Sequence, residues 1–338
     1  MSAQTSRWSE LARVSSLTSR HMAEPCLGQN TPLAQRRKAN AHYLETMIQV
    51  GTKRAGVDRF SQIAIRRRDE ARQLTQQVNR IFGCVLTPQG WTKGALGIGE
   101  DGRVGTVSGE PISESDARSS GEPLILPGFI DTHVHGGGGR DIMEGGDAAS
   151  VVAREHARHG TTALVATTMT APMSDIDIAF AALASVCKSR RGSGARVLGV
   201  HLEGPYLNPG KLGAQPDFVK HLSIDEVKRL HAIAPIRILT LAPEVDDHVA
   251  LIPALSALGI RVQAGHSLAS YEDGVNALAK GAAGFTHLFN AMTAMHHRKP
   301  GLVGAALAHA EYAEIIPDLL HVHPGAIHAA LRAIPKLF

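Results

Sequence analysis

Cysteine and long apolar runs are scarce in this chain of 338 residues. Its three cysteines, Cys26, Cys84 and Cys187, form no CxxC pair, which excludes a disulfide framework and a thiolate zinc site. No apolar run reaches the length of about 20 residues that a membrane span needs, and no signal-peptide core follows Met1. We therefore expect a soluble, cytoplasmic protein. The absence of a GxSxG elbow, a P-loop and a dinucleotide fingerprint argues against serine hydrolases and nucleotide-binding proteins.

Positive charge is concentrated at the start of the chain. Residues 1–75 contain 13 Lys and Arg against 6 Asp and Glu, a net charge of +7, and residues 76–338 contain 22 and 25, a net charge of −3. The main body is therefore slightly acidic, which disfavours nucleic acid as a partner of the whole protein. The basic segment 53–72 leaves such a role open for the N-terminal part, but a solvated helix face is the simpler interpretation.

Three segments differ in their sequence pattern. Residues 1–77 are expected to form an N-terminal extension that is partly disordered or helical, because the first 40 residues show little periodicity. Short β-rich runs separated by turn signals predict a partial small β-sandwich domain over 78–123. From 124 to 338, seven apolar strands alternate with helices, which predicts a parallel α/β sheet. The low aromatic content, 4%, also suits a repeating βα enzyme better than a β-sandwich.

The stretch LILPGFIDTHVHGGGG, residues 124–139, places His133 and His135 at the end of a predicted strand. Side chains at i and i+2 of a strand share one face, so we expect both imidazoles to point the same way. The four glycines that follow are expected to let the backbone pass close to whatever the imidazoles bind.

Other predicted strands also end in polar residues, among them Glu203 in HLEGP, His266 in AGHS and His287 in THLFNAM. In a (β/α)8 barrel this edge of the sheet carries the active site. Imidazole nitrogens and carboxylate oxygens are ligands of Zn²⁺, so these three residues predict a metal site, with the two earlier histidines available for a second ion. Such an ion activates water and polarises a carbonyl, which indicates hydrolysis of an amide or a similar acyl bond.

The motifs LPGFIDTHVHGGGG, VLGVHLEGPYLNPGKLGAQ, TLAPE, QAGHS, THLFNAM and DLLHVHPGAI resemble, in this order, those of the N-acetylglucosamine-6-phosphate deacetylase family of the amidohydrolase superfamily. The resemblance covers residues 78–338. It implies a metal-dependent (β/α)8 barrel that converts the phosphosugar N-acetylglucosamine 6-phosphate to glucosamine 6-phosphate and acetate. One or two divalent ions are implied, with zinc as the default and iron(II) as the alternative.

The resemblance also implies roles for individual residues. Glu203, His266 and His287 would hold the principal metal, and His133 and His135 match the HxH that permits a second ion. Substrate contacts are implied for four other positions, namely Gln215, which replaces a histidine of some relatives, Asn290, Ala291 and His321. Arg298 matches a basic residue that reaches the phosphate bound by a neighbouring subunit, which implies a homodimer.

Two departures from the family pattern affect these expectations. Leu319 stands where the family has a glycine, which puts the position of His321 in doubt. The family's general acid/base is an aspartate on the eighth strand, and this sequence ends at AIPKLF, on or just before that strand. We therefore expect a barrel that lacks its last strand and helix, folds poorly and is catalytically impaired.

Two alternative functions stay open at this point. The first is a catalytically inactive amidohydrolase remnant that binds a sugar phosphate or a partner. The second is an amidohydrolase that acts on another amide, such as a cyclic one. Cyclic-amide hydrolases commonly carry a carbamylated lysine between their metals, where this chain has Glu203, which disfavours the second alternative.

Overall fold

The computed structural model describes residues 80–99, 102–189 and 194–338. The predicted extension over 1–77, with its basic segment, lies outside these residues. Within the described ranges, no helix is both long and apolar enough to cross a membrane.

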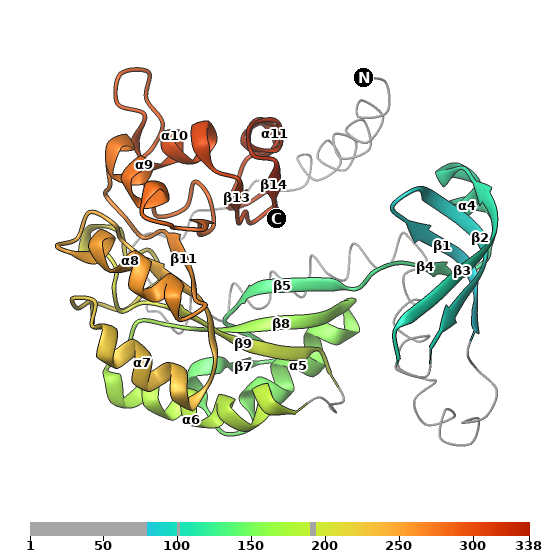
Figure 1. Ribbon diagram of the computed structural model, residues 1–338, viewed down its shortest axis with the longest axis horizontal. Coiled ribbons are helices and arrows are strands. Elements are labelled where there is room, and N and C mark those ends of the chain that lie inside the picture. The colour runs from blue at the N-terminus through green and yellow to red at the C-terminus, as the bar shows by residue number, and fades with distance from the viewer. Residues whose placement is uncertain (1–79, 100–101, 190–193) are drawn as a thin grey trace, which may run out of the picture. The chain divides into compact units, whose positions relative to one another are not determined.

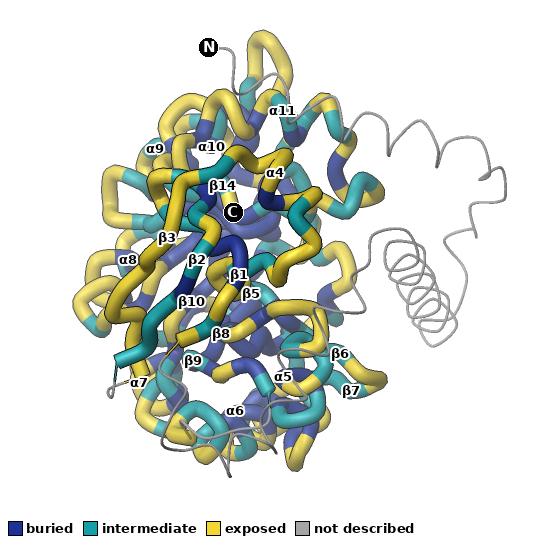
Figure 2. The backbone as a smooth tube through the Cα atoms, turned by 90° about the vertical axis from the view of Figure 1, so that its right-hand side faces the viewer, coloured by how far each residue is buried: buried dark blue, intermediate teal, exposed yellow. Residues whose placement is uncertain are grey.

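A small mixed sheet comprises β1 (Arg80–Thr87), β2 (Gly90–Ile98), β3 (Val104–Ile112) and β4 (Leu124–Ile125), in the order β3-β2-β1-β4 (Figure 1). The first three strands are antiparallel, and β4 runs parallel to β1. Cys84, Trp91 and Ala117, the last from helix α4 (Glu114–Ser119), form its buried cluster. The edge strand β3 is exposed along almost its whole length (Figure 2).

The single strand predicted over 124–135 is divided in the structure. Its first part is β4 of the small sheet, and its second part is β5 (Phe129–Val134) of the large sheet. Pro127 separates the two because proline has no N–H to donate to a strand ladder. A Cβ at Gly128 would lie 2.0 Å from Thr162 Cγ2, so this position has no room for a larger residue.

The large sheet has eight parallel strands, ordered β14-β13-β12-β11-β10-β9-β8-β5. After β5 come β8 (Thr161–Thr168), β9 (Arg196–Glu203), β10 (Ile236–Leu241), β11 (Arg261–Ala264), β12 (Gly284–Phe285), β13 (Tyr312–Ala313) and β14 (Lys336–Leu337). The predicted fold class, a barrel-type parallel α/β sheet with a smaller β domain, is confirmed. The final residues add the short strand β14 to the seven that we expected, and within the described residues β5 and β14 are the two edges.

Helices connect the strands in the manner of repeated βα units. They are α5 (Ala148–Arg158), α6 (Met173–Lys188), α7 (Ile224–Ile233), α8 (His248–Ala257), α9 (Tyr271–Ala279), α10 (Gly301–His309) and α11 (Pro324–Ala333). Helix α5 packs against β8, α6 against β9 and α8 against β11 (Figure 1). Ser223 caps α7 as its sequence predicts, because its hydroxyl accepts the N–H of Glu226.

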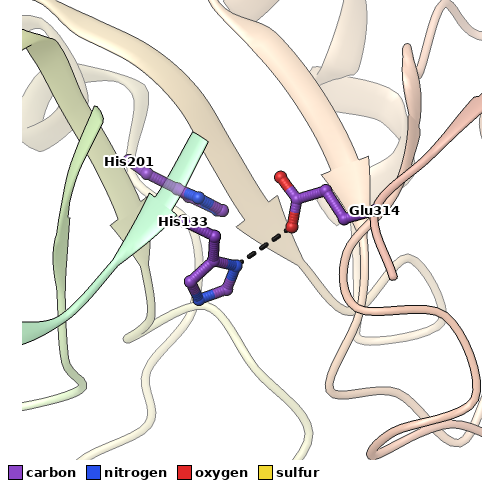
Figure 3. A group of neighbouring side chains, drawn as sticks. All are labelled: His133, His201 and Glu314. Carbon is purple, nitrogen blue, oxygen red and sulfur yellow. Dashed lines mark hydrogen bonds and ion pairs between the residues drawn. The ribbon is translucent and has the colours of Figure 1, made fainter. Parts of the chain in front are cut away.

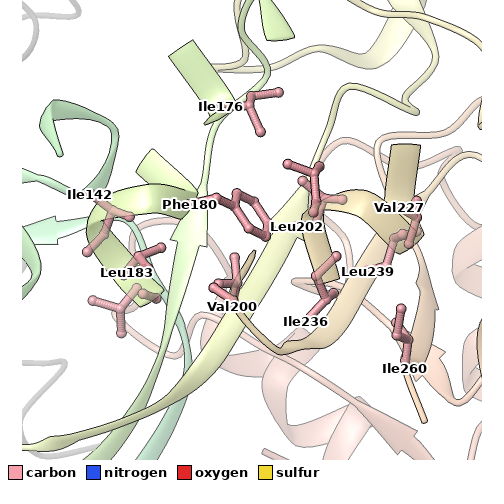
Figure 4. Close-up of a cluster of buried hydrophobic side chains, with 14 of the residues drawn as sticks. Ile142, Ile176, Phe180, Leu183, Val200, Leu202, Val227, Ile236, Leu239 and Ile260 are labelled. Carbon is pink, nitrogen blue, oxygen red and sulfur yellow. The ribbon is translucent and has the colours of Figure 1, made fainter. Parts of the chain in front are cut away.

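Alternation along the strands separates an apolar layer from a polar interior. Val200 and Leu202 of β9 and Leu239 of β10 join Phe180 and Leu183 of α6 in the main hydrophobic cluster (Figure 4). The side chains that alternate with these apolar ones are polar and buried, namely His201, Glu203 and Thr240. His201 hydrogen-bonds to Thr240 on the neighbouring strand, and Glu203 contacts His266 beyond the end of β11. Because successive side chains on a strand point to opposite faces, the packing of the helices fixes which residues face the interior.

His248, at the start of α8, makes stability depend on pH. Its Nδ1 donates to the carbonyl of Ala242 at 3.0 Å, and its Nε2 accepts the N–H of Leu222 at 3.0 Å. Burial lowers the pKa of His248 below its ordinary value. Its neutral form is therefore favoured in the native state, whereas the unfolded chain takes up a proton near pH ~6.5.

We expect His248 to contribute stability that is present above about pH 6.5 and is lost as the pH falls. Urea unfolding on either side of that pH, at about 7.5 and about 5.5, measures this loss. His248→Gln keeps a donor and an acceptor without titrating, so the variant should lose less stability than the wild type between the two values. Equal losses in both proteins would contradict the assignment.

Candidate metal centre

The five predicted metal ligands lie in one cluster, with the buried glutamate among them at its centre. Glu203, the last residue of β9, is 1% exposed. Its Oε1 lies 3.1 Å from the Nε2 atoms of both His266 and His287 and 3.4 Å from that of His133. Its Oε2 lies 2.9 Å from Nε2 of His135. The carboxylate therefore joins two histidine pairs.

Each histidine reaches the cluster from the C-terminal end of a strand. His133 lies in β5 with His135 just beyond its end, and His266 and His287 follow β11 and β12 by two residues. The last two adopt φ angles of 49° and 31°, in the left-handed region that non-glycine residues rarely occupy. Such strain is stored where the surrounding structure enforces it, commonly at functional sites.

Two of the four imidazoles are anchored through their Nδ1 atoms. His266 Nδ1 donates to the carbonyl of Lys211 at 2.8 Å, and His133 Nδ1 lies 3.0 Å from Oε2 of Glu314. The Nδ1 atoms of His135 and His287 are buried and have no hydrogen-bond partner within the described part of the chain. Each histidine pair thus contains one anchored and one unanchored ring.

The electrostatics of the cluster follow from its two carboxylates. Burial by itself would raise the pKa of Glu203, but His133 and hydrogen bonds from the other imidazoles hold that pKa well below its usual range. Burial opposes the charge of His133, yet Glu203 and Glu314 together raise the pKa of His133 to about 10. The two carboxylates therefore favour positive charge within the cluster, either as a proton or as a cation.

The donor set fits a divalent metal ion. The Nδ1–H of His266 is committed to a carbonyl, so Nε2 is the nitrogen left to hold a proton or a metal ion, and it lies 3.1 Å from Oε1 of Glu203 and 3.0 Å from Nε2 of His287. Converging lone pairs repel one another unless a cation lies among them. Four imidazoles cannot all be protonated in one buried pocket, and nitrogen and carboxylate donors suit Zn²⁺ or Fe²⁺. The triads His133/His135/Glu203 and Glu203/His266/His287 both have the spacing of metal ligands.

A third triad, His133, His201 and Glu314, also has this spacing but does not form a ligand set (Figure 3). Both nitrogens of His201 are engaged, Nδ1 with the carbonyl of Thr132 at 3.2 Å and Nε2 with Thr240 Oγ1 at 2.7 Å. Burial and the neighbouring His133 lower the pKa of His201 to about 4, so it is neutral. It packs edge-on against the His133 ring, with 4.6 Å between the ring centroids.

Gln215 contacts the glutamate itself. Its Nε2 donates to Oε2 of Glu203 at 2.5 Å, and its Oε1 accepts the N–H of Thr170 at 2.6 Å. Gly204, directly after the glutamate, has φ 84°, and a Cβ there would lie 2.0 Å from Thr170 Oγ1. The HLEGP motif therefore requires its glycine for a backbone conformation and a close approach that a side chain would prevent.

Glu244, at the end of the TLAPE motif, holds the loops around His266 in place. Its carboxylate accepts the side chain of Asn208 at 2.8 Å, the hydroxyl of Ser267 at 2.6 Å and the N–H of Leu268 at 2.5 Å. These contacts fix the segment that follows the strained histidine and the loop that faces it. Glu244 is thus a structural anchor and is not part of the metal cluster.

The implied phosphosugar contacts lie in the segment after His287. The N–H of Asn290 donates to the carbonyl of His287 at 3.0 Å, and the carbonyl of Ala291 accepts the N–H of Ser267 at 3.0 Å. The half-buried pair is therefore adjacent to the loops that carry His266 and His287. Arg298 lies farther along, exposed, in a turn closed by backbone hydrogen bonds between His296 and Lys299.

His321 lies in an exposed turn and makes no described contact with the metal cluster. Asp318 accepts its backbone N–H at 2.8 Å, and the second oxygen of Asp318 lies 2.6 Å from its Nδ1. Leu319 takes φ 67°, the left-handed conformation for which the family's glycine is suited. The leucine does not prevent this turn, because Asp318 also accepts the N–H of Leu320 at 2.9 Å and stabilises it.

Sequence reasoning missed Glu314 and the hairpin that follows His135. Glu314 directly follows β13, and an acidic residue next to a strand end is a signal that could have found it. The glycines form a hairpin in which β6 (Gly136–Gly137) pairs with β7 (Arg140–Asp141). Gly138 and Gly139 take φ 61° and 77°, as a tight hairpin turn requires.

A parallel barrel sheet with an imidazole–carboxylate cluster at its C-terminal edge is typical of metal-dependent hydrolases. Comparison with known proteins agrees. The family model described as "Amidohydrolase family" matches residues 124–323. The structure of N-acetyl-D-glucosamine-6-phosphate deacetylase from Mycobacterium smegmatis is 30% identical, with a TM-score of 0.65 over 75% of this chain and 73% of that one.

Relatives in other bacteria are more similar in sequence. N-acetylglucosamine-6-phosphate deacetylase of Vibrio furnissii is 40% identical over 257 residues, which cover 73% of this chain and 64% of that protein. N-acetylgalactosamine-6-phosphate deacetylase of Escherichia coli O157:H7 is 38% identical over 248 residues, covering 72% and 65%. This chain thus spans slightly less than two thirds of the length of these relatives.

The chain belongs to the amidohydrolase family and, within it, to the N-acetylglucosamine-6-phosphate deacetylases.

Replacing Leu319 by glycine should stabilise the protein. Glycine removes the left-handed strain of about 1–2 kcal/mol but adds about 0.5–1 kcal/mol of unfolded-state entropy, so we expect a net gain of up to about 1.5 kcal/mol. Urea unfolding measures it. Leu320→Gly, next to it but without positive φ, is the matched control and should destabilise. A lower unfolding midpoint for Leu319→Gly would show that its turn is not strained.

Proposed function

We propose that this protein hydrolyses the 2-acetamido group of N-acetylglucosamine 6-phosphate to acetate and glucosamine 6-phosphate. The observation that carries the proposal is the buried Glu203 carboxylate between two pairs of imidazole nitrogens. The relatives named as deacetylases of amino-sugar phosphates support the substrate class. So does a structural neighbour from M. smegmatis, a mutant of the deacetylase solved in complex with N-acetyl-D-glucosamine-6-phosphate.

Glu203, His266 and His287 would hold the principal ion, with His133 and His135 beside them for a second. We propose Zn²⁺, with Fe²⁺ as the alternative, because both accept nitrogen and oxygen donors. A cation in this position supplies Lewis acidity, which polarises the acetamide carbonyl and makes water a stronger nucleophile at neutral pH. Gln215 keeps Glu203 oriented through its 2.5 Å hydrogen bond.

Substrate recognition is assigned to the loops that border the cluster. Asn290 and Ala291 would contact the sugar phosphate. Gln215 would contact the sugar through the second N–H of its amide, because Glu203 and Thr170 engage its other polar groups. His321 would contact the acetamide through Nε2, because Asp318 occupies its Nδ1. This assignment requires substrate to bind between the 318–321 turn and the metal ligands.

Amine release from N-acetylglucosamine 6-phosphate by the chain of 338 residues tests the proposal. We expect release with Zn²⁺ supplied and its loss after chelation. Glu203→Gln should lower kcat/KM by at least about 100-fold, because the carboxylate shared by both ligand triads is removed. Glu311→Gln is the matched control, since Glu311 is an exposed carboxylate that pairs with Lys336, away from the cluster.

The 4-epimer, N-acetylgalactosamine 6-phosphate, belongs in the same assay, because one of the relatives is named for it. Faster release from this sugar would change the proposed substrate but not the reaction. Tight binding of both sugars without any amine release would instead assign the chain a sugar-phosphate-binding role.

Arg298 extends the proposal to a homodimer. Its exposed position in a closed turn suits a guanidinium that reaches a phosphate bound by a second copy, to which it can donate two parallel hydrogen bonds. Arg298→Ala should raise KM for the phosphorylated sugar about 10- to 100-fold, because hydrogen bonds to charged groups contribute about 1.5–3 kcal/mol. Turnover of unphosphorylated N-acetylglucosamine should not change.

Mixing two variants tests the exchange between subunits. A heterodimer of Arg298→Ala with Glu203→Gln has one site with both an intact glutamate and an arginine from the neighbour. Partial recovery of activity on mixing would support the dimer. Absence of recovery from two co-assembled variants would place the arginine in its own subunit's site.

A further inference from the structure

Glu314 is a buried carboxylate that neither the sequence motifs nor the proposed reaction uses. It follows β13 directly and is 5% exposed. Its Oε2 lies 3.0 Å from Nδ1 of His133, and its Oε1 accepts the hydroxyl of Thr132 at 3.3 Å. Figure 3 shows the carboxylate directed at the edge of the His133 ring, with His201 beside it.

The backbone holds Glu314 rigidly against the segment that carries His287. Its N–H donates to the carbonyl of Phe285 at 2.9 Å, and its carbonyl accepts the N–H of Leu288 at 2.7 Å. These two bonds fix the backbone of Glu314, and its burial together with the hydrogen bond from Thr132 restricts the side chain. The contact to His133 is therefore preorganised by the fold.

The contact determines which nitrogen of His133 faces the cluster. A carboxylate only accepts, so Nδ1 keeps its proton, and when a cation replaces the Nε2 proton the lone pair there is directed at Glu203 and at Nε2 of His135, which is 3.1 Å away. A hydrogen bond from a ligand imidazole to a carboxylate orients the ring and makes it a stronger donor. His266 has only a neutral carbonyl in the equivalent place.

Charge leads to the same conclusion. Glu314 brings a second negative charge into a pocket where Glu203 is the other buried carboxylate. Two divalent cations beside Glu203 alone would leave a large excess of positive formal charge, and the carboxylate of Glu314 lowers that excess. A buried carboxylate is costly unless positive charge lies close to it.

We propose that Glu314 is a positioning residue that selects the Nε2-donor form of His133 and thereby allows a divalent cation to occupy the His133/His135/Glu203 position, as the second ion of the site. This proposal rests on the metal-dependent function proposed above. Under this proposal, Glu314 affects metal occupancy of the His133/His135/Glu203 position but not of the Glu203/His266/His287 position.

Metal uptake without substrate tests the proposal. The metal-free protein is titrated with Zn²⁺ against a chromophoric chelator, and bound metal is counted by mass spectrometry. We expect two ions in the wild type. In Glu314→Gln, which keeps an acceptor but loses the charge, the second ion should bind about 10- to 100-fold more weakly while the first is unchanged. Glu314→Leu, which loses both features, should weaken it further.

Co²⁺ added to protein already loaded with one Zn²⁺ gives an independent readout. Its visible absorption reports the ligands of the second position and should change in Glu314→Gln but not in the control Glu311→Gln. A purely structural role would lower the unfolding midpoint and weaken both ions equally. Equal weakening of both ions would overturn the proposal. So would an unchanged affinity for the second ion in both Glu314 variants, or the binding of a single ion by the wild type.

The outcome is separable from that of the proposed function. A chain inactive on both sugar phosphates that still loses its second ion in Glu314→Gln would refute the deacetylase proposal and retain this one. Turnover of either sugar with unaltered metal uptake in the variant would support the deacetylase proposal and refute the role of Glu314.

Discussion

The buried carboxylate of Glu203 is the constraint on which the rest of the site depends. An isolated charge at 1% exposure is strongly unfavourable, so the surrounding chain must supply positive charge or hydrogen bonds to both oxygens. Four imidazoles and the amide of Gln215 do so from different strands and loops. The candidate ligands therefore converge on Glu203 from separate parts of the chain, and their convergence offsets the cost of burying its charge.

The strain at the site is balanced by the loops around it. His266 and His287 occupy the left-handed region, which costs about 1–3 kcal/mol for each non-glycine residue. Glu244 fixes the segment around the first, and the backbone bonds to Glu314 fix the segment around the second. The helix-facing side of the sheet forms an apolar cluster, and this packing fixes which side chains of each strand face the site.

Much of the architecture follows from local sequence. The βα alternation, most helix positions and the N-cap Ser223 were predictable because each depends on side-chain periodicity or on a contact three residues away. The division of the first strand was not foreseen. Pro127 interrupts the apolar run, but only the pairing of Leu124 with Cys84 shows that its first part belongs to another sheet. The hairpin made by the glycines was not predicted because its second strand, Arg140–Asp141, has no strand pattern of its own.

The sequence alone determined the chemical type of the site and its five candidate ligands, because each ligand is placed at the end of a strand by a pattern of apolar residues that is readable along the chain. Only the tertiary structure decided how these candidate ligands are oriented and which residues form hydrogen bonds to their Nδ1 atoms. Glu314 is separated from His133 by 181 positions, and no local pattern couples residues so distant. Their contact arises because the parallel sheet curls and brings β5 and β13 to the same interior, and a hydrogen bond across that space depends on the fold as a whole.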